Sequence, residues 1–210
     1  MQRKNLSSQL LPLLVWCALA ILLIAAVPLF LCQHLPNDAA YYDVQARCVL
    51  EGGTLYRDVV EPNLPGIVWV HMAIRSVFGW STVTLRVFDL VFLAGTSSLL
   101  VRWNRTDRSQ PHGLQTPLLV LAVFWMHFCL TEWCHCQRDG WMLLPGLAAL
   151  SLRDRNLRDT NLKTALPSLW GYSLFEGMLW GTAFWLKPHI AFPALFALLA
   201  SCLWAGLSIA

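Results

Sequence analysis

Residues Leu11 to Leu31 form a stretch of about 21 residues without a charged side chain, and an α-helix of about 20 apolar residues crosses a bilayer. Arg3 and Lys4 precede the stretch, as they would in a secretory signal. A signal, however, has a shorter apolar region that is followed by a small-residue cleavage site. We therefore predict a first membrane-spanning helix at about 11–31, with the N-terminus of the chain in the cytoplasm.

The composition agrees with an integral membrane protein. Of the 210 residues, 57% are hydrophobic and 13% are charged. The net charge is only +3 and the basic residues form no single patch, so we expect no nucleic-acid partner. The odd number of cysteines, most of them in apolar stretches, predicts no disulfide framework. We predict an all-α, multi-pass membrane protein, a polytopic helical bundle surrounded by membrane lipids.

Further apolar stretches predict the rest of the bundle. We expect spanning helices at about 81–103, 116–131, 140–152, 166–186 and 190–210, of which 140–152 is short for a span. The outer loop 33–64 contains an interfacial helix at 38–51, and a second follows at 65–78. Asn37 is the predicted N-cap of the first interfacial helix, and Gly52-Gly53 is its predicted end. Because the chain stops within an apolar stretch, we interpret residues 1–210 as one transmembrane domain, the N-terminal part of a longer protein.

The distribution of charge supports this topology. The predicted cytoplasmic segments carry nine Lys or Arg residues and the predicted outer segments carry six, in agreement with the positive-inside rule. Arg86 and Asp89 share one face of the predicted helix 81–103, where a buried pair would either fix helix packing or belong to a site. The nine cytoplasmic residues are Arg3, Lys4, Arg102, Arg105, Arg108, Arg153, Arg155, Arg158 and Lys163.

Another group of polar residues falls in predicted outer segments that are far apart in the sequence. Acids beside Arg and Lys suit a lipid-linked anionic substrate, because the cations bind its phosphate and a carboxylate accepts a proton from an attacking hydroxyl. Solvated charges at the rim of the bundle would explain some of these residues equally well, and Asp38 could instead only stabilise a helix N-terminus. The candidate catalytic residues are Asp38 and Asp58, and the candidate substrate-binding residues are Tyr41, Arg57, Asn63, Arg86, Arg138, Asp139, Lys187 and His189.

Several short motifs follow one another in a distinctive order. They are Asn37-Asp38-x-x-Tyr41-Tyr42, Glu51-Gly52-Gly53-x-Leu55-Tyr56-Arg57-Asp58, Asn63-Leu64-Pro65-Gly66, Phe78-Gly79-Trp80-Ser81, Gln137-Arg138-Asp139 and Phe184-Trp185-Leu186-Lys187-Pro188-His189. This order resembles the N-terminal part of GT-C fold membrane glycosyltransferases, namely the protein O-mannosyltransferase and aminoarabinose lipid A transferase group and similar bacterial enzymes. The resemblance covers roughly residues 10 to 200.

The resemblance implies an activity and a location. It implies a polyprenyl-phosphate sugar donor and an inverting transfer on the outer face of a bacterial inner membrane to an acceptor that is a glycan, a lipid or a protein. Asp38 corresponds to the catalytic acid of the first outer loop. We assign Asp38 as the general base, with Asp58 sharing that role or orienting Arg57. Arg138, Lys187 and Arg57 would neutralise the departing phosphate.

The sequence assigns no metal ligand. Family members often have an adjacent acidic pair where this chain has Asp38-Ala39, and a lone carboxylate is a poor site for a divalent ion. A divalent-metal requirement therefore stays open. Cys134-His135-Cys136 has no second ligand pair, so we interpret it as incidental.

Two other classes of function compete with an enzyme. A transporter or flippase for lipid-linked sugars should carry ionisable residues in the middle of facing helices, where only Asp89 and Glu176 qualify. A non-catalytic scaffold, or an inactive fragment, predicts that Asp38 can be lost without effect.

Overall fold

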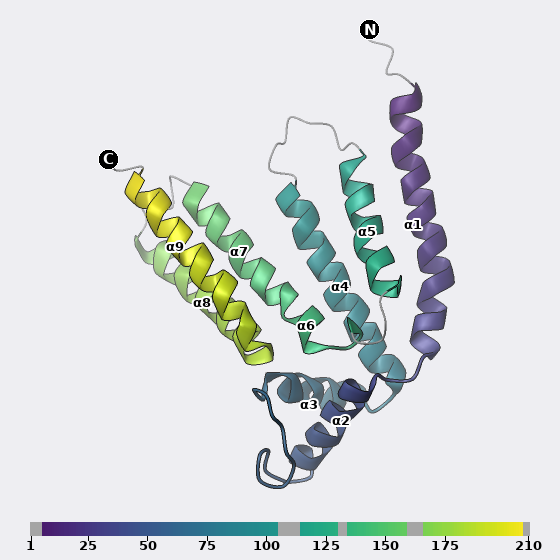
Figure 1. Cartoon of the computed structure of the whole chain (residues 1–210), viewed down its shortest axis with the longest axis vertical. Coiled ribbons are helices and arrows are strands. Elements are labelled where there is room, and N and C mark those ends of the chain that lie inside the picture. Colours follow the sequence, from purple (N-terminus) through teal and green to yellow (C-terminus); the bar gives the residue numbers. More distant parts are fainter. Residues whose placement is uncertain (1–5, 105–113, 130–133, 159–165, 208–210) are drawn as a thin grey trace.

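The computed structural model describes residues 6–104, 114–129, 134–158 and 166–207, and their regular structure is helical, as predicted (Figure 1). The predicted loop residues between these ranges lie outside the described residues. In chain order the elements are α1 (Leu6–Cys32), α2 (Asn37–Leu50), α3 (Gly66–Phe78), α4 (Thr82–Asn104), α5 (Gln115–Cys129), α6 (Arg138–Trp141), α7 (Leu143–Arg158), α8 (Leu166–Leu186), the 3-10 helix η3 (Pro188–Ile190) and α9 (Ala191–Leu207).

Among the residues that the structure describes, two helices are long and apolar enough to cross a membrane by length and composition, at Leu10–Cys32 and Thr82–Asn104. Shorter apolar helices are Gly66–Phe78, Gln115–Cys129 and Pro188–Leu203. Large apolar side chains are exposed on several helices. Ile24 of α1 and Phe192 of α9 are each 76% exposed. A membrane would cover such surfaces.

We use the term long helices for α1, α4, α5, α7, α8 and α9. They lie side by side, and α2 and α3 lie across one end of them (Figure 1). Helix α1 packs against α5 and α4, α4 packs against α7, and α7 packs against α8. The C-terminal ends of α1, α5 and α8 and the beginnings of α4, α6 and α9 all reach the end that α2 and α3 cover (Figure 1). Segments far apart in sequence therefore meet at this end.

Two predicted boundaries are wrong for identifiable reasons. Asn37 is the first helical residue of α2 rather than its N-cap, because Pro36 takes the capping position and its carbonyl accepts a hydrogen bond from the Ala40 amide at 2.9 Å. The predicted helix 140–152 is instead α6 followed by α7, which continues to Arg158. Arg153 therefore lies in a helix, where its Nε donates to Glu176 of α8 at 2.5 Å. Neutralisation by Glu176 lets the helix continue past the basic residues.

The predicted end of α2 at the glycine pair is correct. The Gly53 amide donates to the Cys48 carbonyl at 2.8 Å, and the Gly52 amide donates to the Val49 carbonyl at 3.0 Å. This is the Schellman pattern, in which the first residue beyond the helix needs a left-handed backbone. Gly52 has that backbone, with a φ of 97°. The chain thus leaves α2 and enters the loop that carries residues 54–64.

The core lies between the α2–α3 layer and the ends of the long helices. Its buried side chains come from α2, α3, α4, α6 and α8, so each of these elements is held to the others. They are Ala39, Tyr42, Ala46, Ile67, Val68, Ile74, Leu85, Trp141 and Leu186, together with Cys136 just before α6.

A buried ion pair joins α2 to α3. The Arg75 side chain, on α3, is 2% exposed, and its Nε donates to Asp43 Oδ1 of α2 at 2.9 Å. His71 Nδ1 lies 2.9 Å from the same oxygen. Arg75 Nη1 also donates to the Gly79 and Ser81 carbonyls at 3.1 and 2.6 Å, which reach toward α4. One guanidinium therefore fixes the positions of three helices.

The pKa directions agree with this pairing. Burial alone would raise the pKa of Asp43, but hydrogen bonds from His71 and Arg75 outweigh burial and lower it. Burial lowers the pKa of His71, so its imidazole is neutral at pH 7 and donates a hydrogen bond to the carboxylate.

The predicted pairing of Arg86 with Asp89 on α4 is wrong. Asp89 Oδ1 accepts a hydrogen bond from Trp141 Nε1 at 2.6 Å, and Asp89 Oδ2 lies 3.3 Å from His127 Nε2. Arg86 donates to the His34 carbonyl and lies over the Phe30 ring, with its guanidinium carbon 4.5 Å from the ring centroid. The two charges therefore fix packing separately.

The Asp43 network yields a stability prediction. In the Asp43→Asn variant, Arg75 stays buried without its counter-charge, so the free energy of unfolding should fall by about 3 kcal/mol. The matched control is Asp58→Asn, which breaks a pair at the exposed Arg57 and should change stability little. Denaturant unfolding in detergent measures both. Equal losses for the two variants would contradict the role of the Asp43 network.

Candidate functional site

Tyr42 of α2 experiences the charges of side chains from several segments. Burial raises the pKa of Tyr42 to about 12, and the positive charge of Arg138 opposes that shift. The negative charges of Asp38, Glu61 and Asp139 add to it. These groups come from α2, from the loop after it and from α6, yet all act on one hydroxyl. We call Asp38, Tyr42, Glu61, Arg138 and Asp139 the Tyr42 cluster.

Lys187, just after α8, extends the cluster. Its Nζ lies 2.7 Å from Asp139 Oδ1, and its side chain is mostly buried whereas that of Asp139 is half exposed. Asp139 thus positions an ammonium group beside the cluster. The cluster and Lys187 together bring the predicted residues Asp38, Arg138, Asp139 and Lys187 to one region.

The end of α8 reaches this region because α3 approaches it unusually closely. A Cβ atom at Gly66, the first residue of α3, would lie 2.3 Å from the Trp185 carbonyl oxygen. The Trp69 and Trp185 rings extend the contact, with centroids 5.3 Å apart. Only glycine at position 66 permits this backbone approach.

Asp38 lies exposed in the first turn of α2. Within the part of the chain that the structure describes, no hydrogen bond or ion pair engages its carboxylate. Its charge nevertheless acts on Tyr42. The carboxylate is therefore exposed and unpaired among the described residues.

Glu61 is a member of the cluster that the sequence reasoning missed. It is 4% exposed, and its Oε1 accepts hydrogen bonds from the Asn63 amide at 2.8 Å and from Asn63 Nδ2 at 2.6 Å. Its Oε2 and Arg138 Nη1 are buried without a hydrogen-bond partner among the described residues. Buried polar atoms normally have partners, so these two atoms offer binding capacity to a ligand. The only sequence signal for Glu61 is its place two residues before Asn63.

Tyr41 holds the loop against α2, and Asn63 makes hydrogen bonds within the loop. The Tyr41 hydroxyl donates to the Val60 carbonyl, which also accepts from Gln45 Nε2 at 2.9 Å. The Asn63 carbonyl accepts from the Tyr56 hydroxyl at 2.7 Å. These contacts position the loop that carries Glu61, so the two predicted substrate-binding residues also have structural roles.

Arg57 and Asp58 pair with each other in the exposed part of the loop. Arg57 donates to both carboxylate oxygens of Asp58 at 3.0 and 2.7 Å, and the Thr54 amide donates to Asp58 at 2.7 Å. The Arg57 hydrogen bond and then the Thr54 amide lower the pKa of Asp58. Neither residue acts on the Tyr42 hydroxyl. Of the two predicted roles for Asp58, the geometry favours orientation of Arg57 over proton transfer.

Arg86 and His189 are predicted substrate-binding residues that lie outside the Tyr42 cluster. Arg86 is buried against Phe30 and the His34 carbonyl, so it links α4 to the connection between α1 and α2. His189 is exposed in η3, two residues after Lys187. The structure therefore does not bring Arg86 into the Tyr42 cluster.

The described residues include no group of three or more His, Cys, Asp or Glu side chains placed to hold a metal ion. In Cys134-His135-Cys136, His135 Nε2 lies 2.8 Å from the His127 carbonyl oxygen. Burial raises the pKa of Cys136, which keeps its thiol protonated. These side chains serve the packing beside α5.

Comparison of the chain with protein-family models, with curated proteins and with solved structures finds no match. The function is therefore argued from the geometry of the site.

The close approach at Gly66 yields a prediction with an internal control. Gly66→Ala should force α3 away from α8 and lower the free energy of unfolding by about 1–3 kcal/mol. Gly177→Ala, on α8, meets no atom within 4 Å, so its gain in helix propensity should raise stability by up to about 1 kcal/mol. Thermal unfolding in detergent compares them, and a shift of the same sign in both variants would contradict the close contact.

Proposed function

We propose that this protein is a membrane glycosyltransferase that moves a sugar from a polyprenyl-phosphate donor to an acceptor at the outer face of the membrane, with inversion. The observation that carries the proposal is the Tyr42 cluster with Lys187. The charges of Asp38 and Arg138 both act on Tyr42, and Lys187 pairs with Asp139 next to Arg138 in the chain, at one end of a set of long apolar helices. The reaction requires cations that bind the donor phosphate and a carboxylate that accepts a proton from the acceptor.

The proposal includes a membrane arrangement. The long helices cross the membrane, the N-terminus is cytoplasmic, and α2 and α3 lie at the outer boundary. The C-terminal ends of α4 and α7 lie at the opposite end of the helices (Figure 1), and these ends carry Arg102 and Arg155, as the positive-inside rule would require of a cytoplasmic side. The donor lipid would then reach the Tyr42 cluster from the outer leaflet.

In the proposed reaction the acceptor hydroxyl attacks the anomeric carbon of the donor sugar. The bond from that carbon to the phosphate oxygen breaks, and its electron pair leaves with the polyprenyl phosphate. The hydroxyl proton passes to the carboxylate of Asp38. Attack from the face opposite the phosphate inverts the anomeric configuration.

Arg138 and Lys187 stabilise the charge that grows on the departing phosphate. Fixed cations aimed at developing charge are usually the largest contribution to such catalysis. Asp139 holds Lys187 at 2.7 Å, so that ammonium group is preorganised. Glu61, with one buried carboxylate oxygen unpaired, would accept a hydrogen bond from a sugar hydroxyl.

The transporter alternative is less consistent with the packing of the two acids within the long helices. Glu176 pairs with Arg153 and also accepts from Trp180 Nε1 at 3.2 Å, while Asp89 contacts Trp141 and His127. Both carboxylates therefore have partners that fix helix packing. The groups with free binding capacity in the Tyr42 cluster lie at the end of the helices.

The first prediction of the proposal concerns topology. In a variant with its native cysteines replaced, an impermeant thiol reagent added from outside should label single cysteines at Gln33 and Val60, which are exposed at the α2–α3 end. It should not label cysteines at Asn104 and Arg155 until the membrane is permeabilised. Labelling of Asn104 and Arg155 from outside would overturn the proposed orientation and the outer-face site with it.

The second prediction concerns proton transfer. Asp38→Asn keeps the shape of the side chain but cannot accept a proton, so sugar transfer by the full-length protein in membranes should fall about 10²- to 10⁴-fold. Binding of the polyprenyl-phosphate sugar should change little. Asp58→Asn is the comparison, and its effect on transfer should be small because Arg57 and Thr54 already engage that carboxylate. Normal transfer by Asp38→Asn would remove its assignment as the base.

The third prediction separates a charge role from a base role. Lys187→Ala should weaken donor binding about tenfold or more, because a hydrogen bond to a charged group is lost. It should also slow transfer if the ammonium serves the leaving group. Asp139→Asn keeps the cation and should weaken donor binding less. Equal losses in both variants would mean that Lys187 serves only to pair with Asp139.

A further inference from the structure

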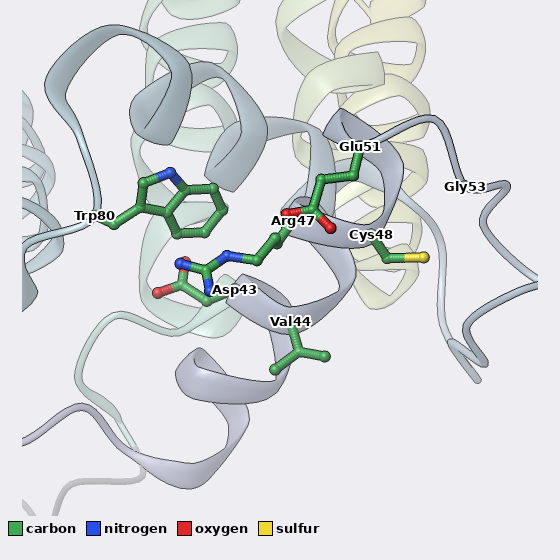
Figure 2. A pocket seen from close by; sticks show the side chains of 7 residues that line it. All are labelled: Asp43, Val44, Arg47, Cys48, Glu51, Gly53 and Trp80. Atoms are coloured by element: carbon green, nitrogen blue, oxygen red, sulfur yellow. The ribbon is translucent and has the colours of Figure 1, made fainter.

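A cleft opens beside Arg47 and Glu51 of α2 (Figure 2). Its volume is about 660 Å³, within the roughly 300–1,000 Å³ of small-molecule sites. The cleft lies where α2, its C-terminal glycines and the turn before α4 come together. Its lining residues are Asp43, Val44, Arg47, Cys48, Glu51, Gly53 and Trp80.

This cleft is separate from the Tyr42 cluster. Tyr42 and Arg47 are five residues apart on α2, which at 3.6 residues per turn places them about 140° apart around the helix. Tyr42 is buried toward the core, whereas Arg47 and Glu51 are exposed. The body of α2 thus stands between the two sites.

The hydrogen-bonding groups of the cleft are unusually available. Arg47 and Glu51 are spaced i and i+4, which normally favours an ion pair on a helix. The structure instead holds the Arg47 guanidinium over the Trp80 ring, 4.5 Å from the ring centroid. Among the described residues no hydrogen bond or ion pair engages the Glu51 carboxylate or the Arg47 guanidinium. A guanidinium and a carboxylate, neither with a hydrogen-bond partner among the described residues, therefore line the same cleft.

The third charged group of the cleft, the Asp43 carboxylate, already has partners within the fold. Asp43 already accepts from Arg75 and His71, so its charge is neutralised inside the fold. Trp80 is 40% exposed, with the Arg47 guanidinium over its ring and the Arg75 guanidinium carbon 5.5 Å from the same centroid, so the apolar surface is the part of the indole that these cations leave uncovered. The cleft therefore offers an aromatic surface, a donor and an acceptor together, with no excess of either charge.

We propose that this cleft binds a saccharide unit of the acceptor, an inference that rests on the proposed transferase function. A pyranose ring has faces of C–H groups that pack on an indole, and hydroxyls at its edge that both donate and accept hydrogen bonds. Glu51 accepts from the hydroxyls and Arg47 donates to them. An anion would be repelled by Glu51, and a lipid tail would leave both charged groups unpaired. The acceptor is thus a glycan that extends from the Tyr42 cluster around α2.

The test is residue-resolved oxidation of tryptophan by hydroxyl radicals, with and without sugars. The probes are methyl glucoside, methyl galactoside, methyl mannoside and the matching disaccharides, with sodium phosphate as the anion. A bound sugar should slow oxidation of Trp80 by about twofold at half saturation. Trp69, which is 51% exposed on α3 and remote from the cleft lining, is the internal control and should not change. No protection of Trp80 by any of these sugars would overturn the proposal.

Variants make the assignment specific. Glu51→Gln and Arg47→Ala should each weaken the protection of Trp80 about tenfold, because each loses a charge-assisted hydrogen bond. Protection that neither variant weakens would overturn the proposal. So would protection by phosphate that Glu51→Gln strengthens, since that would identify an anion site.

The outcome is distinguishable from failure of the proposed function. Asp38→Asn should lose sugar transfer yet keep full protection of Trp80, because the two sites lie on opposite sides of α2. Sugar-dependent protection in a protein without any transfer activity would support the saccharide cleft and overturn the transferase proposal. Loss of protection in Asp38→Asn would instead overturn the separate cleft.

Discussion

The pairing of Asp43 with Arg75 is the interaction on which the site end of this protein depends. A guanidinium that is 2% exposed is tolerated only with a counter-charge and with acceptors for its remaining hydrogens. Asp43 supplies the charge, and the Gly79 and Ser81 carbonyls supply acceptors. Because these groups belong to α2, to α3 and to the turn before α4, satisfying one buried charge fixes the orientation of α2. Every functional inference drawn from α2 depends on that orientation.

The orientation of α2 decides what each of its faces can do. One face directs Tyr42 toward Arg138 and Asp139 of α6, and the end of α8 adds Lys187 because Gly66 lets α3 approach the Trp185 carbonyl. The opposite face presents Arg47 and Glu51 beside Trp80. A single helix thus separates the cluster to which we assign phosphate binding and proton transfer from the cleft to which we assign a neutral polar ligand.

The helices were more predictable from the sequence than the contacts between them. Charge-free stretches and glycine signals depend on neighbouring residues, so α1, α8 and the end of α2 lie where the sequence predicts. Partner choice depends on distant segments. Arg153 was predicted in a loop because its partner Glu176 is distant in the sequence. The spacing of Arg86 and Asp89 suggested that they contact each other, whereas Asp89 contacts Trp141 and Arg86 contacts the His34 carbonyl. Glu61 was missed because its burial and its hydrogen bonds with Asn63 arise only in the folded loop.

The most direct test is an experimental structure of the full-length protein in lipid nanodiscs with a polyprenyl phosphate bound. We predict that the phosphate lies between Arg138 and Lys187 at ion-pair distance, with the Asp38 carboxylate facing the side on which an acceptor would approach. A phosphate bound at the opposite end of the long helices, beside Arg102 or Arg155, would contradict this assignment. So would an α2 turned so that Asp38 and Tyr42 face away from Arg138.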